Sequence, residues 1–319
     1  MKVLITDNIA GRAIDMLRKE FEVELRVSLS EEDLIKLLPS YDILIVRSSV
    51  RVTEPVIRAG KLLRLIARPG VGVDNIDVKA AKSAGIPVIN TPLGNVNAAA
   101  EHTIAMMLSI ARHIPKGYHS LKVKREWERK RFVGVELRDK TLGIIGFGNV
   151  GQIVGRIAKN GLMMNALAYD PADRSSDASR LGITMVSLEE IYSNSDFISI
   201  HVPLTEQTRN LITQVEIDKM KHGVYIINAA RGGLIDELAL YNSLGSGRVA
   251  GAAIDVWAKE PCLDSPLLEL DNVLPLPHLG ASTIEAQENV AIDIAKQIID
   301  AVKVGSVTSS VNGITRLRM

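Results

Sequence analysis

A glycine-rich segment directly after an apolar run constrains the fold of this chain more than any other feature. Residues 141–151 read Thr-Leu-Gly-Ile-Ile-Gly-Phe-Gly-Asn-Val-Gly, a G-x-G-x-x-G pattern between a predicted strand and a predicted helix. Gly146 permits a tight turn, Gly148 lets the backbone approach a pyrophosphate, and Gly151 lets helix and strand pack closely. The helix N-terminus adds unpaired N–H groups. The segment therefore predicts a dinucleotide-binding site in a doubly wound α/β domain.

An acidic residue stands where such a site needs one. Asp170 ends the next predicted strand, 19 residues after Gly151 (170 − 151), and an acid at this position binds the ribose 2′-hydroxyl of NAD. Its charge would repel a 2′-phosphate, although Arg174 could partly offset that repulsion. The alternative is a sharp Asp170-Pro171 turn without a ligand. We favour NAD as the cofactor.

Short β-rich apolar runs alternate with helical stretches along the whole chain. This alternation predicts parallel sheets with helices on both faces. In the first third we expect strands at residues 3–6, 43–46, 65–67 and 88–89. A second series is expected at 142–145, 166–169, 197–200, 225–228, 250–254 and 273–274.

Two long helical patterns separate and close these series. Residues 98–112 carry small and apolar side chains on nearly every side, which predicts a buried helix, and residues 282–304 have apolar residues at helical spacing. We therefore expect two doubly wound parallel-sheet domains. A Rossmann-type NAD-binding domain spans 98–284, and the chain then crosses back to a flavodoxin-like substrate domain made of 1–97 and 285–319.

Charge and cysteine content exclude several classes of function. The 38 Lys and Arg residues nearly balance the 37 Asp and Glu residues, so the net charge of +1 gives no overall field for nucleic acid or an acidic membrane. The apolar runs are too short for a membrane span or a secretory signal. Cys262 is the only cysteine, which excludes an internal disulfide and a thiolate metal cluster. We expect a cytoplasmic protein without a metal.

A second glycine-rich stretch lies in the first domain. Residues 68–74 read Arg-Pro-Gly-Val-Gly-Val-Asp and lack the third glycine of a dinucleotide loop. Backbone N–H groups around Val71 and Gly72, together with Arg68, could hold a small anion such as a carboxylate. An ordinary tight turn is the alternative.

Three polar residues follow predicted strands of the second domain, at the edge where doubly wound folds bind ligands. They are Arg231, Glu260 and His278. Each has a simpler interpretation taken alone: an arginine in a surface turn, a solvated acid before a proline, and a capping histidine. Their shared position predicts that they lie beside a bound ligand.

Together with the glycine loop, these segments resemble the D-isomer-specific 2-hydroxyacid dehydrogenases over nearly the whole chain. The matching segments are Val46–Ser49, Gly70–Asn75, Asn90–Asn95, Ala99–Thr103, Trp127–Lys130, Tyr169–Pro171 and His201–Thr205. The resemblance implies hydride transfer between a substrate carbon bearing a hydroxyl and the nicotinamide ring.

In that family, His278 would take the hydroxyl proton during oxidation and return it during reduction. Glu260 would orient the imidazole and favour its charged form, and Arg231 would bind the substrate carboxylate through its planar fork of donors. The active site would lie in the cleft between the domains.

The resemblance also implies the residues that bind the cofactor. Asp255 would bind the nicotinamide carboxamide, the Ala229 backbone would line the ring, and Thr205 would lie near the pyrophosphate. Asn149-Val150 replaces the Arg-Ile common in related loops, which would weaken phosphate contacts without removing the backbone site. The full expected set is Gly146, Gly148, Asn149, Val150, Gly151, Asp170, His201, Val202, Pro203, Thr205, Ala229, Ala230, Asp255 and Gly280.

The substrate arginines distinguish members of the family. A phosphorylated substrate adds close to two negative charges, and Arg47 and Arg68 both follow apolar strands of the first domain. Two charge-assisted contacts of about 1.5–3 kcal/mol each would sum to about 3–6 kcal/mol. A surface salt bridge is the alternative role for Arg47. Val71 and Gly72 complete the expected substrate set.

The resemblance is strongest to the branch that oxidises D-3-phosphoglycerate with NAD at the start of L-serine synthesis. Alternatives are a glyoxylate or hydroxypyruvate reductase, another D-2-hydroxyacid dehydrogenase, and a nonenzymatic NAD-sensing corepressor. We expect a short form without a C-terminal regulatory domain. Residues 116–140 have nine Lys or Arg and four Asp or Glu, a net of 9 − 4 = +5, typical of a solvated face or a subunit contact. A homodimer is expected, in which Arg129 or Arg131 could reach the neighbouring subunit's site.

Overall fold

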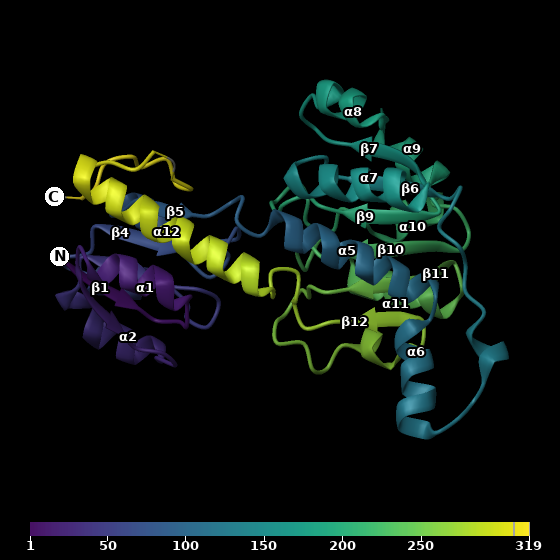
Figure 1. Ribbon diagram of the computed structural model, residues 1–319, viewed down its shortest axis with the longest axis horizontal. Helices are drawn as coiled ribbons and strands as arrows, with labels where there is room; N and C mark the ends of the chain where they lie inside the picture. Colours follow the sequence, from purple (N-terminus) through teal and green to yellow (C-terminus); the bar gives the residue numbers. More distant parts are fainter. Residues whose placement is uncertain (309, 319) are drawn as a thin grey trace. The chain divides into compact units, whose positions relative to one another are not determined.

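Two parallel β-sheets organise the protein, each within its own unit of the chain (Figure 1). The structure is a computed structural model that describes residues 1–308 and 310–318. Unit 1 comprises Met1–Val96 and Ala281–Met319, and unit 2 comprises Asn97–Gly280. Ser309 and Met319, which the sequence assigns to the substrate domain, lie outside the described residues.

Unit 1 contains a five-stranded parallel sheet in the order β2-β1-β3-β4-β5, the flavodoxin-like order predicted. The strands are β1 (Lys2–Ile5), β2 (Glu22–Leu25), β3 (Ile43–Ile45), β4 (Leu65–Arg68) and β5 (Val88–Asn90). The helices are α1 (Gly11–Arg18), α2 (Glu31–Leu37), α3 (Glu54–Ala59), α4 (Val78–Ser83) and α12 (Ile284–Val304), with a short 3₁₀ helix at Leu38–Ser40.

Alternate residues of the unit 1 strands face two different helix layers. Ile5 packs in a cluster with Leu17 of α1 and Ile294 of α12, whereas its neighbour Leu4 packs with Leu34 of α2 on the opposite face. All five side chains have no exposed surface. The period-two pattern thus buries both faces of the sheet, as parallel sheets require.

Unit 2 contains a seven-stranded parallel sheet in the order β12-β11-β10-β9-β6-β7-β8. Renumbered within the unit, this is the Rossmann order 3-2-1-4-5-6 with a seventh strand added. The strands are β6 (Thr141–Ile145), β7 (Asn165–Tyr169), β8 (Thr184–Met185), β9 (Phe197–Ile200), β10 (Val224–Asn228), β11 (Val249–Ile254) and β12 (Val273–Pro275). The helices are α5 (Val96–Ala111), α6 (Ile114–Tyr118), α7 (Asn149–Leu162), α8 (Ser175–Leu181), α9 (Leu188–Asn194), α10 (Gln214–Lys219) and α11 (Glu237–Gly245). Short helical turns lie at His119–Lys124, Arg129–Phe132 and Pro266–Glu269.

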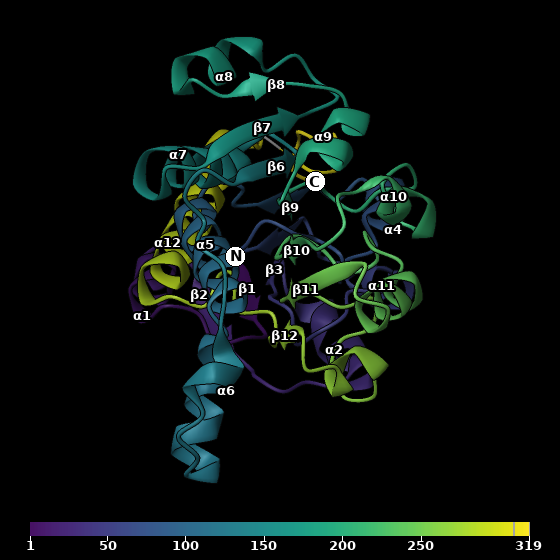
Figure 2. The ribbon, with the colours of Figure 1, turned by 90° about the vertical axis from the view of Figure 1, so that its right-hand side faces the viewer.

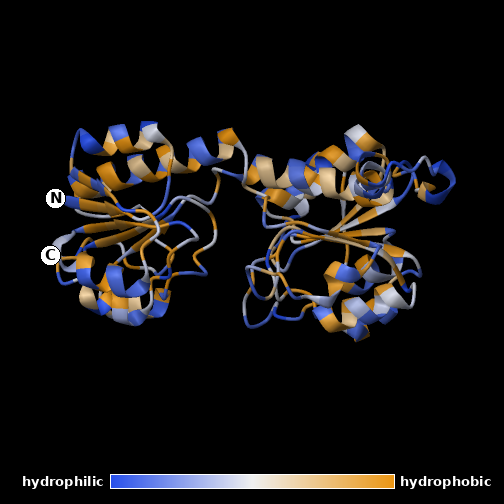
Figure 3. Ribbon diagram, turned by 90° about the horizontal axis from the view of Figure 1, so that it is seen from below, coloured by the Kyte–Doolittle hydropathy of each residue, from blue (hydrophilic) through white to orange (hydrophobic). Residues whose placement is uncertain are grey.

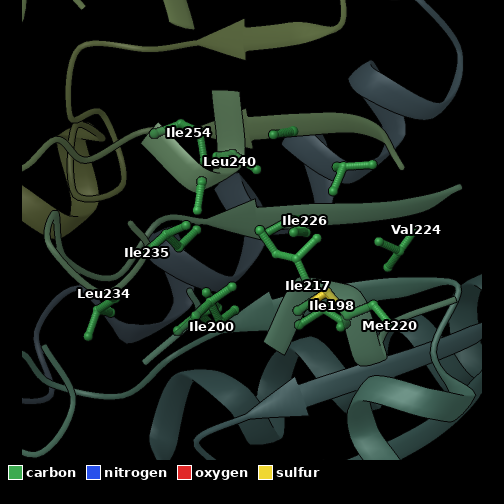
Figure 4. Close-up of a cluster of buried hydrophobic side chains, with 14 of the residues drawn as sticks. Ile198, Ile200, Ile217, Met220, Val224, Ile226, Leu234, Ile235, Leu240 and Ile254 are labelled. Atoms are coloured by element: carbon green, nitrogen blue, oxygen red, sulfur yellow. The ribbon is translucent and has the colours of Figure 1, made fainter. Parts of the chain in front are cut away.

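Helices cover both faces of this sheet as well, and the strands are its most hydrophobic part (Figure 3). One core cluster joins the sheet to α9, α10 and α11, including Ile198, Ile226 and Leu240 (Figure 4). The other joins it to α5 and α7, with Met107 and Val154 almost or fully buried. The buried helix predicted from its sequence is therefore part of the core of unit 2.

Two edge strands were not predicted from the sequence. In β2 the glutamates Glu22 and Glu24 interrupt the apolar run, because one edge of this strand has no neighbour and its side chains are only partly buried. The second is β8, an edge strand of the seven-stranded sheet in unit 2, where only two residues pair with β7. The described residues thus form sheets of five and seven strands rather than the four and six expected.

Among the described helices, none is both long enough and apolar enough to span a membrane. The segment after α5 projects from the body of unit 2 with α6 at its start (Figure 2). Every residue from 121 to 130 is exposed.

Candidate active site

The glycine loop follows β6, at the point where the strand order of unit 2 reverses. Gly146 has φ +97°, and a Cβ there would lie 2.7 Å from the carbonyl carbon of His201. A Cβ on Gly151 would lie 2.1 Å from the Gly146 carbonyl oxygen, so helix α7 can approach the loop only because residue 151 has no side chain.

Gly148 differs, because a Cβ at this position would meet no atom of the protein within 4 Å. Gly148 is the N-cap of α7, and no side chain caps the helix there. Asn149 and Val150 form the first turn and present backbone N–H groups. An open glycine at an uncapped helix N-terminus fits a dinucleotide pyrophosphate.

Asp170 joins the end of β7 to this loop. Its Oδ2 accepts a hydrogen bond from the Phe147 N–H at 2.8 Å, and its Oδ1 accepts one from the Ala172 N–H at 2.9 Å. The side chain is half-buried. A carboxylate fixed in this way keeps lone pairs for a ribose hydroxyl. Arg174 is half-buried nearby in the sequence, and its Nε has no hydrogen-bond partner among the described residues.

The loop after β9 contains four more of the expected cofactor residues, His201, Val202, Pro203 and Thr205. His201 Nε2 lies 2.8 Å from Ser199 Oγ, and burial lowers the pKa of His201 to about 4, so the ring is neutral at pH 7. Val202 is buried beside the glycine loop. Thr208 donates to the Pro203 carbonyl at 2.6 Å and lies 3.0 Å from the Thr205 hydroxyl. These bonds fix the loop at the carboxyl edge of the sheet.

His278 and Glu260 form a hydrogen-bonded pair. His278 Nδ1 lies 2.8 Å from Glu260 Oε2, and the other oxygen, Oε1, accepts the Trp257 N–H at 3.1 Å. Burial acts to raise the pKa of Glu260, but the bonds from His278 and Trp257 outweigh it and hold this pKa below its ordinary value. Glu260 is therefore an anion that can orient the imidazole. His278 has φ +59°, an uncommon conformation for a residue other than glycine.

Arg231 lies on the loop after β10. Its Nη1 donates to the Ala230 carbonyl at 2.6 Å, and its own carbonyl accepts a bond from Asn228 Nδ2 at 2.9 Å. Ala229 and Ala230, which lie between Asn228 and Arg231 in the chain, are both half-buried.

The neighbouring Gly232 was not predicted from the sequence to have a role. A Cβ on Gly232 would lie only 1.9 Å from the Trp257 carbonyl oxygen. The absence of a side chain therefore lets the arginine loop pack directly against the segment that leads to Glu260.

Asp255 directly follows β11 and has no exposed side-chain surface. Its Oδ1 accepts the Leu279 N–H and its Oδ2 the Gly280 N–H, both at 2.8 Å. His102 Nε2 lies 3.3 Å from Oδ2. His102 belongs to a matching segment in the sequence but was given no role there. A signal was available, since it is the one imidazole in α5, a helix of mainly small and apolar residues.

In unit 1, Arg47 lines a pocket of about 330 Å³ at the carboxyl edge of the sheet. The other lining residues are Thr6, Asp7, Asn8, Val27, Ser28, Ser48 and Ser49. Among residues 1–308 and 310–318, no ion pair or hydrogen bond involves the Arg47 guanidinium. The salt bridge considered as its alternative role is therefore not formed within the described chain.

Asp7 organises this pocket, although no pattern in the sequence marked it for selection. Its carboxylate accepts the Arg47 N–H at 2.8 Å, the Ser49 N–H at 3.2 Å and the Ser49 hydroxyl at 2.5 Å. These bonds fix the loop on which Arg47 stands.

The second glycine-rich stretch forms a braced loop after β4. Arg68 Nη1 donates to the Gly72 carbonyl, and Asn90 Nδ2 donates to the Val71 carbonyl at 2.6 Å. The Gly70 N–H is bonded to Thr91 Oγ1 at 2.7 Å. The structure therefore assigns Arg68 a bracing role in its own loop, and its expected substrate role stays a prediction.

Comparisons with known proteins agree on one family. Residues 104–280 match the family model described as D-isomer specific 2-hydroxyacid dehydrogenase, NAD binding domain. The chain is 48% identical to D-3-phosphoglycerate dehydrogenase of Archaeoglobus fulgidus over 314 residues, 98% of this chain and 59% of that protein. It is 46% identical to hydroxypyruvate reductase of Thermotoga maritima over 303 residues, 93% of this chain and 97% of that protein.

The fold has close counterparts among solved structures. The TT0316 protein of Thermus thermophilus superposes with a TM-score of 0.89 at 31% identity, covering 98% of this chain and 100% of that one. The chain spans little more than half the length of the phosphoglycerate dehydrogenases that it matches, 56% for the Synechocystis protein.

Proposed function

The chain belongs to the D-isomer specific 2-hydroxyacid dehydrogenase family, and from this premise we propose that it oxidises D-3-phosphoglycerate to 3-phosphohydroxypyruvate with NAD. The observation that carries the chemistry is the Glu260–His278 pair at 2.8 Å, on the sheet edge that also bears the glycine loop. The 48% identity to the Archaeoglobus fulgidus enzyme supports the choice of substrate.

His278 is the group that exchanges the proton. Its Nδ1 is bound to Glu260, so Nε2 is the atom left to take the proton from the substrate hydroxyl. The Glu260 carboxylate stabilises the positive charge that the ring gains in this step, as in other oriented acid–base pairs. During reduction the same nitrogen returns the proton.

Arg231 binds the substrate carboxylate, for which a guanidinium offers two parallel donors. The residues that would hold NAD are Gly146, Gly148, Gly151 and Asp170 around the pyrophosphate and ribose. When bound, the nicotinamide ring supplies the hydride-accepting centre. The low aromatic content of 4% is consistent with a pocket of aliphatic walls and backbone donors.

We assign the substrate phosphate to Arg47. Its guanidinium has no ion-pair partner among the described residues and lines a pocket that also offers the Ser48 hydroxyl. The Asp7 carboxylate would disfavour an anion, and the bonds from the Arg47 N–H and Ser49 lessen this repulsion without removing the charge. A charge-assisted contact contributes about 1.5–3 kcal/mol.

A steady-state comparison of D-3-phosphoglycerate with D-glycerate tests this assignment. We expect kcat/KM to favour the phosphorylated substrate by about 10- to 100-fold, the value of one such contact. Equal efficiency would instead favour hydroxypyruvate reductase, the second candidate, because the Thermotoga maritima relative matches over 97% of its length. NADH binding without turnover of 3-phosphohydroxypyruvate would point to a nonenzymatic corepressor.

The proposal includes a biological setting. We place the reaction at the start of L-serine synthesis in the cytoplasm, a reducing compartment that suits a chain whose single cysteine cannot form an internal disulfide. We also propose a homodimer, because Tyr118, Leu121 and Trp127 on the projecting segment of unit 2 are 64%, 51% and 75% exposed.

A further inference from the structure

Asp255 is a charged group in a place where charge is costly. Its side chain has no exposed surface, and a buried carboxylate requires hydrogen bonds and a compensating partner. The Leu279 and Gly280 N–H groups satisfy two of its lone pairs at 2.8 Å. His102 reaches the same carboxylate from α5, with Nε2 3.3 Å from Oδ2.

The two amides that Asp255 holds come directly after His278. This residue is fixed on one side by its ring bond to Glu260 and on the other by the Asp255 clamp on its chain neighbours. Its φ of +59° is a conformation that surrounding structure must maintain. The position of the imidazole therefore depends on where the Asp255 carboxylate lies.

We propose that His102 is a positioning residue for the reaction, acting through Asp255 on the loop that carries His278. His102 is 19% exposed, and its Nε2 is buried with no well-aligned hydrogen bond among the described residues. The Asp255 carboxylate is the charged group within ion-pair distance of that nitrogen. A ring N–H at 3.3 Å attracts the carboxylate electrostatically and so favours the position in which both backbone bonds form.

The inference rests on the proposed dehydrogenase function, and it differs from the expected role of Asp255 toward the nicotinamide carboxamide. A carboxylate has about four acceptor sites, so one can bind a ligand while the others hold the loop and His102. His102 touches neither the reacting atoms nor the proposed ligands in this scheme. Its loss should therefore change kcat more than the binding of NADH.

The test uses His102→Leu, which removes the donor but keeps a similar volume, and His102→Gln, whose amide nitrogen can occupy the place of Nε2. Glu101→Gln is the matched control, because Glu101 is exposed on the same helix and bonds only Asn97 among the described residues. Each variant is assayed for kcat and KM on whichever 2-hydroxy acid the wild type oxidises. NADH affinity is measured by fluorescence, and amide hydrogen exchange of Leu279 and Gly280 is measured without ligands.

We expect His102→Leu to lower kcat about 10- to 100-fold, with NADH affinity within about twofold and faster exchange of both amides. His102→Gln should recover most of both losses, and Glu101→Gln should match the wild type. Unchanged exchange in a folded His102→Leu protein, or equal losses in the Leu and Gln variants, would overturn the proposal. A wild type that oxidises no 2-hydroxy acid would refute the proposed function, and the exchange rates would still decide the role of His102.

Discussion

Both sheets have aspartates that follow one strand and accept N–H groups from the loop after a neighbouring strand. In unit 1, Asp7 follows β1 and accepts the Arg47 N–H from the loop after the adjacent strand β3. In unit 2, Asp170 follows β7 and accepts the Phe147 N–H after β6, and Asp255 follows β11 and accepts two N–H groups after β12. Each aspartate ties together neighbouring loops at a carboxyl edge.

The difference lies in what the tied loops carry. In unit 1 the loop presents a guanidinium and the Ser48 hydroxyl around a pocket, whereas in unit 2 the loops present open backbone and an acid–base pair. We infer that unit 1 selects the substrate and unit 2 performs the chemistry. The fold fixes where loops meet, and the side chains at the strand ends decide their function.

The strongest test of this division is His278→Ala. Because the substrate proton has no other acceptor in the scheme, kcat should fall about 10³-fold, for phosphorylated and plain substrates alike. NADH affinity, measured by fluorescence titration, should stay within about twofold of the wild type. His222→Ala, at an exposed histidine of the same unit, is the control. A near-normal rate in the His278 variant would remove the chemistry from this pair.

Arg47→Ala tests the role of unit 1 with a smaller expected effect. The ratio of kcat/KM for D-3-phosphoglycerate over D-glycerate should fall about 10- to 100-fold, because one charge-assisted contact is lost while the plain substrate is unaffected. Arg51→Ala changes an exposed arginine nearby and should leave the ratio unchanged. If both substrates lose efficiency equally, Arg47 supports the fold rather than selecting the substrate.

Gly148→Ala separates ligand binding from folding within unit 2. Since a Cβ there meets no protein atom within 4 Å, stability should be unchanged, while a methyl group facing the pyrophosphate should weaken NADH binding about tenfold. Gly151→Ala is the contrasting variant, because its Cβ would meet the Gly146 carbonyl oxygen at 2.1 Å. That variant should unfold at lower denaturant concentration. Unaltered NADH binding in Gly148→Ala would argue against the assigned cofactor position.

The smallest expected effect is on the pH dependence of stability. His201 has a pKa of about 4 in the folded protein and 6.5 ordinarily, so the unfolded chain binds more protons between these values. His201 therefore contributes at most about 3 kcal/mol to the free energy of unfolding. This contribution is present above pH 6.5 and is lost as the pH falls to 4.

Denaturant unfolding followed by tryptophan fluorescence can measure this effect in one unit. Both tryptophans, Trp127 and Trp257, belong to unit 2, and Trp257 is buried. His201→Gln should show a weaker loss of unit 2 stability between pH 7 and 4. Parallel pH curves for the wild type and the variant would contradict the assignment to His201.

The sequence was sufficient wherever structure follows from local pattern. The strand at Phe197–Ile200 was predicted with its observed bounds, and the glycine loop was placed correctly after its strand. Both depend on apolar runs and fixed spacing that are visible within a dozen residues. The edge strands at Glu22–Leu25 and Thr184–Met185 were missed because an edge needs no continuous apolar run.

The site was less accessible to sequence reasoning where residues act through distant partners. Asp7 bonds to Ser49, which is 42 residues away, and His102 lies beside Asp255 only after both elements pack. Neither has a spacing that marks its role. The acid, arginine and histidine of unit 2 could be selected as candidates because each follows a strand and therefore shares one edge.

Unit 1 is formed by two segments from opposite ends of the chain, which affects how it folds during translation. Helix α12 supplies Ile294 and Ile298 to one face of the N-terminal sheet, yet it is translated after all of unit 2. On the ribosome, unit 2 can therefore complete its core first, while apolar strand residues such as Val3 and Ile43 remain uncovered on that face. Chaperones that shield exposed apolar surface would act on this chain mainly at its beginning.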